Sequence, residues 1–147
     1  LKQQLSYLLT LLPVLLLYSI FHFFVLDRLV QFSSPVKKID FTLLGIFFAF
    51  VFECAYVALP EEFFFRGYLQ GAAKGKENSW WSIVYAAFLF AVIHVAVNAN
   101  PRRFEVFFPG LLFGWYREKS KAIWISIFAH AACNVTFYCL LQKAWLT

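Results

Sequence analysis

The sequence predicts an all-α protein, a polytopic bundle of about five transmembrane helices. Of its 147 residues, 62% are hydrophobic, 22% aromatic and 14% charged, whereas soluble domains are about 45–50% apolar and about 25% charged. A soluble fold of this length has too little interior to bury so much apolar surface. The five tryptophans lie at or just outside the ends of apolar runs, as expected at headgroup depth: Trp80, Trp81, Trp115, Trp124 and Trp145.

The net charge of +5 also fits a membrane protein. The basic residues lie mostly between apolar runs, where they can meet anionic lipid headgroups. A nucleic-acid-binding face would need them clustered on a soluble surface, so we expect membrane lipids as partners and no nucleic acid. The three cysteines fall inside apolar runs without a CxxC pair, which argues against a disulfide scaffold or a zinc knuckle.

The first expected span is the apolar run Leu5–Leu26, which is long enough to cross a hydrocarbon core of about 30 Å. A cleaved signal peptide is the alternative, but only Lys2 precedes the run and no small-x-small cleavage site follows it. We therefore expect a retained helix. Residues 27–40 form a polar connection, and Asp40 is the expected N-cap of the next helix.

The second expected span is Phe41–Leu59, which Glu53 interrupts. Proline has no amide N–H to donate, so this helix is expected to end or kink at Pro60. Glu61–Ala73 continues as a helical stretch that carries charges where lipid is expected.

Three more helices are expected after a KGKENS loop: Ser82–Asn98, a shorter one at Phe104–Tyr116 before a basic REKSK turn, and Ala122–Leu141. Gly110 and Gly114 form a GxxxG pair within the short helix. This pair either allows close packing on a neighbouring helix or is a chance occurrence.

An ionisable side chain within a span is costly and by default marks a functional site or a buried pair. Such residues occur on several of the expected helices, together with two asparagines: His22, Glu53, Glu61, Glu62, Arg66, His94, Asn98, His130 and Asn134. Because polar groups from three separate helices can converge, the pattern favours a site formed between helices.

Helical spacing sorts these residues by face. Glu62 and Arg66 are four residues apart with the acid first, the favourable order for an ion pair. Glu61 points about 100° away from Glu62, so its carboxylate is left available for general base chemistry. The same four-residue spacing places Asn98 beside His94, and Asn134 beside His130.

Three motifs stand in a characteristic order. EEFFFR at Glu61–Arg66 fits EExxxR, FAVIH at Phe90–His94 fits FxxxH, and HAACN at His130–Asn134 fits HxxxN. On these motifs the chain resembles the CPBP family of intramembrane proteases, which comprises CAAX proteases and bacteriocin-processing enzymes and is also called the Abi family. The resemblance covers about residues 41–141. It implies a single protease-like domain over 1–147, with 1–40 as an accessory first span and connection.

The resemblance also implies roles. Glu61, assisted by His94, would activate a water molecule, and His130 and Asn134 would donate hydrogen bonds to the oxyanion. The pair of Glu62 and Arg66 would hold the site together. Phe90 would pack so that His94 is aimed correctly.

The resemblance leaves the cofactor open. No HExxH pattern is present, and a metal-free site is favoured, with no cofactor. The alternative is a zinc ion held by Glu61, His94 and His130. Asn134 suits an oxyanion hole better than a metal shell.

Two residues have a secondary place in this interpretation, Asn98 and Glu53. Glu53 stands where the family more commonly has an apolar residue. It is either a protonated carboxyl facing another helix, or a group that pairs with a further partner or extends a polar cavity.

We therefore expect an endopeptidase that acts near the surface of a prokaryotic plasma (inner) membrane. Its substrate would be a membrane-associated or lipidated protein or peptide: a CAAX-type carboxyl terminus, a precursor peptide or a carboxy-terminal sorting tail. One alternative is a non-catalytic binding or immunity-type member of the same fold. A proton-coupled transporter is disfavoured because the sequence has no internal repeat.

Overall fold

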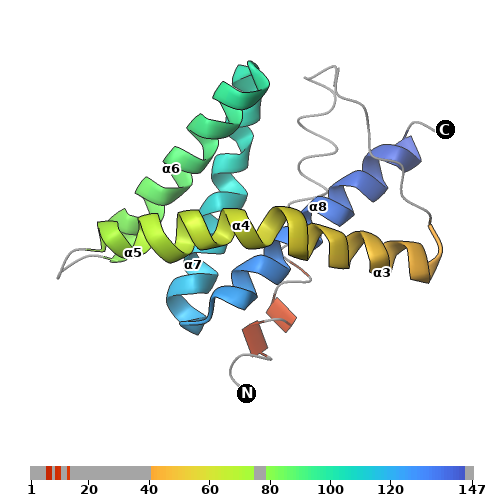
Figure 1. The fold of residues 1–147 in the computed structure, drawn as a ribbon, viewed down its shortest axis with the longest axis horizontal. Coiled ribbons are helices and arrows are strands. Elements are labelled where there is room, and N and C mark those ends of the chain that lie inside the picture. Colours follow the sequence, from red (N-terminus) through yellow and green to blue (C-terminus); the bar gives the residue numbers. More distant parts are fainter. Residues whose placement is uncertain (1–5, 8, 11–12, 14–40, 75–78, 145–147) are drawn as a thin grey trace.

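The computed structural model describes residues 6–7, 9–10, 13, 41–74 and 79–144, and within them the expected all-α fold is confirmed by four helices. The first is a continuous helix of 31 residues, Leu43–Ala73. It consists of α3 (Leu43–Phe52), α4 (Leu59–Glu62) and α5 (Gln70–Ala73), joined by two π-helical segments, η2 (Glu53–Ala58) and η3 (Phe63–Leu69). Figure 1 shows it as a rod that runs across the molecule.

The other three helices are α6 (Ser79–Asn98), α7 (Phe107–Ser120) and α8 (Ile123–Ala144), with a 3₁₀ turn, η4 (Pro101–Val106), between α6 and α7. The α6 helix packs along α7, and α8 packs against both α7 and the η2 part of the long helix (Figure 1). The polar residues of the long helix therefore face α7 and α8 from within the bundle.

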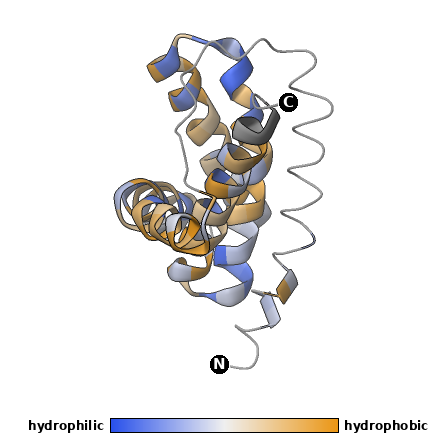
Figure 2. Cartoon of the chain, turned by 90° about the vertical axis from the view of Figure 1, so that its right-hand side faces the viewer, coloured by the Kyte–Doolittle hydropathy of each residue, from blue (hydrophilic) through white to orange (hydrophobic). Residues whose placement is uncertain are grey.

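Within the part of the chain that the structure describes, three helices are long and apolar enough to cross a membrane: Leu43–Ala73, Trp80–Asn98 and Ile123–Leu140. Figure 2 shows hydrophobic residues along most of the length of the helices. The chain is thus an integral membrane protein. The expected first span, Leu5–Leu26, lies largely outside the described residues, and α7 is not among the candidate spans. The described residues thus contain three candidate spans, whereas the sequence predicted about five spans in the whole chain.

Several predicted boundaries differ from the observed ones. Asp40 lies outside the described residues, and the side chain of Thr42 caps the helix, accepting a hydrogen bond from the Gly45 amide at 3.1 Å. The short helix α7, which was expected at Phe104–Tyr116, begins at Phe107. It continues to Ser120, through most of the expected REKSK turn. Residues 101–106 form the 3₁₀ turn instead, because Asn100 caps it by accepting from the Arg102 amide.

Another expectation was that the helix would end or kink at Pro60. The helix does not end there but continues to Ala73. The chain is π-helical just before α4, and the Leu59 amide donates to the Cys54 carbonyl, five residues back. A wider turn of this kind is a local adjustment that lets a helix accommodate a missing donor. The two glutamates after Pro60 therefore belong to the same continuous helix as α3.

The GxxxG pair is a close-packing site. A Cβ atom at Gly114 would lie 2.8 Å from Cγ2 of Ile83, and one at Gly110 would lie 3.3 Å from Cβ of Ala87. Both neighbours belong to α6, so the two glycines allow α7 to approach α6 closely. This resolves the alternative of a chance pair.

We expect Gly114→Ala to lower the free energy of unfolding by about 1–3 kcal/mol, because the added methyl group forces the packed helices apart. Gly71→Ala is the matched control, since a Cβ at Gly71 would meet nothing within 4 Å. That control should be neutral or slightly stabilising, because alanine favours helix more than glycine does. Thermal unfolding in detergent measures both, and an unchanged midpoint for Gly114→Ala would contradict the close approach.

Candidate active site

The centre of the candidate site is a buried ion pair. Glu62 in α4 and Arg66 in η3 are four residues apart, and the Oε1 atom of Glu62 lies 3.0 Å from Nη1 of Arg66. Both side chains are fully buried. Pairing at this spacing is what the sequence predicted, and a buried charge needs such a partner.

Arg66 is held by further contacts with α6 and α7. Its Nη2 donates a hydrogen bond to the Gly110 carbonyl at 3.0 Å. The guanidinium carbon also lies 4.5 Å from the ring centre of Phe90 and 5.4 Å from that of Phe113, which are cation–π distances. Arg66 thereby joins η3 to two other helices.

Glu61 differs from Glu62 in its surroundings, although the two are adjacent. The side chain of Glu61 is 31% exposed, whereas that of Glu62 is fully buried. Oε2 of Glu61 lies 3.8 Å from Nε2 of His130. Glu61 is therefore the carboxylate that a reactant can approach.

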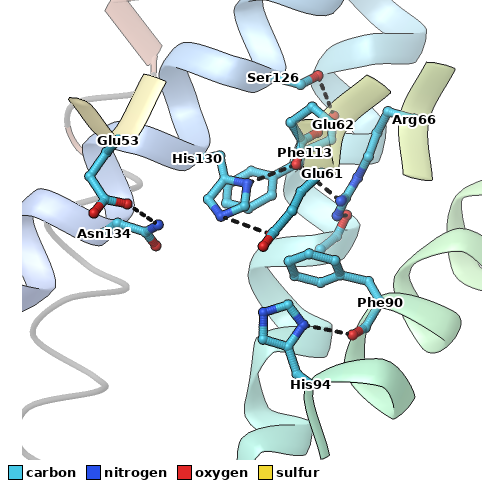
Figure 3. A network of polar contacts seen from close by, with 11 residues as sticks. Glu53, Glu61, Glu62, Arg66, Phe90, His94, Phe113, Ser126, His130 and Asn134 are labelled. Carbon is cyan, nitrogen blue, oxygen red and sulfur yellow. Dashed lines mark hydrogen bonds and ion pairs between the residues drawn. The ribbon is translucent and has the colours of Figure 1, made fainter. Parts of the chain in front are cut away.

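His130 in α8 bridges the two glutamates. Its Nδ1 lies 2.9 Å from Oε1 of Glu62, and its ring stacks on Phe113 with centroids 4.8 Å apart. An ionised carboxylate only accepts hydrogen bonds, so Nδ1 must carry the proton. Nε2, on the Glu61 side (Figure 3), is then a donor only when the ring is doubly protonated.

His94 in α6 is fixed in a similar way. Its Nδ1 lies 2.9 Å from the Phe90 carbonyl, and the two rings are 4.3 Å apart. Because a carbonyl only accepts, Nδ1 is the donor, and Nε2 carries a lone pair in the neutral ring. Asn98 instead donates back to the His94 carbonyl at 2.8 Å, so the structure does not bring it to the other site residues.

Asn134 and Glu53 form a second polar pair. The side-chain amide of Asn134 donates to Oε2 of Glu53 at 2.9 Å, and Glu53 is only 2% exposed. Figure 3 shows this pair on one side of His130 and the Glu61–Arg66 stretch on the other. Glu53 thus faces another helix, α8, and its partner there is Asn134, one of the residues already named for the site.

Two polar contacts next to the site were not predicted from the sequence. Gln70 is buried and donates to the Gly114 carbonyl at 3.1 Å, which repeats the contact of Arg66 with Gly110 one helical turn later. A signal for it exists, because Gln70 follows Arg66 by the same four residues that separate the glycines. Ser126 donates to the Phe113 carbonyl at 2.9 Å, and no sequence pattern marks that contact.

The three residues of the alternative zinc site, Glu61, His94 and His130, are not grouped as metal ligands. Among the described residues, no three His, Cys, Asp or Glu side chains are grouped so that they could hold a metal ion. Glu61 and His130 are neighbours, but His94 does not complete a triad with them. The arrangement of these residues therefore does not fit a zinc site.

The comparisons with known proteins agree with the motifs. Residues 44–136 match the family model described as type II CAAX prenyl endopeptidase Rce1-like. This match covers well over half of the chain and includes all three motifs. The chain belongs to this family. Searches of curated proteins and of solved structures gave no match. Family membership implies an intramembrane protease with a protein substrate.

Proposed function

We propose that the protein is an endopeptidase in which Glu61 activates a water molecule for attack on a peptide carbonyl. The observation that carries this proposal is the contrast between adjacent carboxylates. Glu62 is buried against Arg66 and His130, while Glu61 is partly exposed and lies next to His130. One acid supports the site, and the other is available to react.

His94 assists by orienting the water. Since its Nδ1 donates to the Phe90 carbonyl, Nε2 of the neutral ring can accept a hydrogen bond from the water. Glu61 accepts the second proton as the water oxygen attacks the carbonyl carbon. A tetrahedral intermediate with an oxyanion results.

Asn134 and His130 stabilise that oxyanion. Asn134 has two side-chain N–H groups, of which one is bound to Glu53 and the other can donate to the oxyanion. His130 donates from Nε2 when both of its ring nitrogens carry a proton, and Glu62 then accepts from Nδ1. When the intermediate collapses, the C–N bond breaks and the proton on Glu61 passes to the leaving amine.

The substrate in this proposal is a membrane-associated or lipidated protein or peptide, cleaved near the surface of a prokaryotic plasma membrane. A CAAX-type carboxyl terminus, a precursor peptide and a sorting tail all satisfy this description. The family name favours the first of these.

The test compares the termini of host membrane proteins and peptides by mass spectrometry, in cells that carry wild-type protein or Glu61→Gln. Uncleaved tails found only with the variant would establish the protease and name its substrate. Identical termini, with both proteins folded and equally abundant, would contradict the proposal and favour the non-cleaving, binding member of the fold.

Metal removal gives a second prediction. Because the described side chains do not assemble a metal site, we expect cleavage by the purified protein to remain within about twofold after treatment with a zinc chelator and dialysis. The substrate for this assay is the peptide that the mass-spectrometric comparison identifies. A loss of activity that added zinc restores would overturn the metal-free mechanism.

A further inference from the structure

We propose that Glu53 is a positioning residue that fixes the side-chain amide of Asn134 for oxyanion binding. This inference rests on the proposed function and extends it to a residue outside the three motifs. It follows from the Glu53–Asn134 hydrogen bond, from the burial of Glu53 and from the shape of the helix that carries it.

The π-helical turn gives Glu53 its direction. Eight residues separate Glu53 from Glu61, and in a regular α-helix this spacing would turn them about 80° apart. A π-helical turn contains more residues than an α-helical one, so each residue turns the chain less. The segment Glu53–Ala58 is π-helical, which brings Glu53 closer to the face of Glu61. The η2 segment that it begins packs against α8, which carries Asn134.

The hydrogen bond then selects one orientation of the amide. Asn134 donates from Nδ2 to Oε2 of Glu53 at 2.9 Å. A flipped amide would place its own oxygen against the Glu53 side chain, where two acceptors would repel each other if the acid is ionised. Nδ2 is therefore held in place, and with it the direction of its second N–H. Figure 3 shows the Glu53–Asn134 pair to one side of the His130 ring.

The stability of the fold does not by itself explain why a glutamate occupies position 53. The residue is 2% exposed on a helix that is long and apolar enough to span a membrane, where a carboxyl group is costly. A well-packed apolar residue of similar volume would cost the fold less than a buried polar group. An apolar residue at position 53 could not accept the hydrogen bond from Asn134, and that hydrogen bond is what Glu53 provides.

Two variants of Glu53 separate positioning from packing. Glu53→Gln keeps an oxygen that can accept from Asn134, so kcat should remain at about a third of wild type or more. Glu53→Leu keeps the volume but frees the amide to rotate. We expect its kcat to fall at least tenfold with KM changed less than twofold, because the loss of one oxyanion donor costs about 10²–10³ in kcat.

A double-mutant cycle with Asn134→Ala is the deciding experiment. The substrate is the peptide identified in the cellular comparison, and activity is expressed per folded protein. If Glu53 acts through Asn134, Glu53→Leu should lower kcat in the wild-type background and have less than a twofold effect in Asn134→Ala. Equal effects in both backgrounds would overturn the proposal, as would a fall with Glu53→Gln as large as with Glu53→Leu.

A second cycle needs no substrate and keeps the two proposals distinguishable. Thermal unfolding of the same four proteins in detergent reports whether the two side chains interact. We expect a non-additive change in the midpoint. Additive changes would overturn the contact and with it the positioning role. If the change is non-additive but the wild-type protein cleaves nothing in cells, the contact stands. The proposed function is then contradicted, together with the role of Glu53 in catalysis.

Discussion

Glu61→Gln is expected to abolish cleavage while the yield of folded protein stays at the wild-type level. Glutamine has the shape of glutamate but cannot take a proton from water, and loss of a general base typically costs about 10²–10⁴ in rate. The folded state should tolerate the change because the Glu61 side chain is 31% exposed. Its neighbour His130 keeps its shorter contact with Glu62. Initial rates with the identified peptide, normalised to folded protein, measure the effect.

Glu118→Gln is the matched control for that variant. Glu118 is also partly exposed, but it pairs with Lys74 and Lys121, which lie outside the three motifs. It should keep cleavage within about twofold of wild type. If Glu61→Gln also cleaved at more than about a tenth of the wild-type rate, the Glu61-activated water would be wrong.

Local pairings of polar side chains were easier to predict from the sequence than helix boundaries, and the Glu62–Arg66 pair is confirmed. Ionisable residues stand out within apolar runs, and four-residue spacing is enough to pair Glu62 with Arg66 and to separate Glu61 from both. That reasoning depends only on a local helix, so it survives errors in helix boundaries. The differences between expected and observed structure at Pro60 and Phe104 moved no site residue off its helix.

What the sequence did not predict depends on contacts between helices. The hydrogen bond from Asn134 to Glu53 joins residues that are 81 positions apart, and its geometry depends on a π-helical turn that no residue pattern marks. The stacking of Phe113 on His130 likewise requires the packing of α7 against α8. With 20 phenylalanines in the chain, composition alone could not single out Phe113.

Arg66→Ala should damage folding rather than chemistry. The variant removes the ion pair with Glu62, the hydrogen bond to the Gly110 carbonyl and the contact with the Phe90 ring. Glu62 would then remain fully buried without its counter-charge. Breaking a buried pair in this way costs about 3–5 kcal/mol, so we expect a large fall in the unfolding midpoint and in the fraction of monodisperse protein. Thermal unfolding and size-exclusion chromatography in detergent measure both.

Arg102→Ala is the control, because Arg102 is exposed and its removal should leave the midpoint nearly unchanged. An Arg66→Ala protein with a wild-type midpoint would contradict the buried pair. Replacing both partners, in Glu62→Leu with Arg66→Leu, should recover much of the lost stability, since an apolar pair avoids burying an unpaired charge. Cleavage should not return, because His130 would have lost the carboxylate that orients Nδ1. Stability restored without activity would show that the ion pair serves to position His130 and that the fold could do without it.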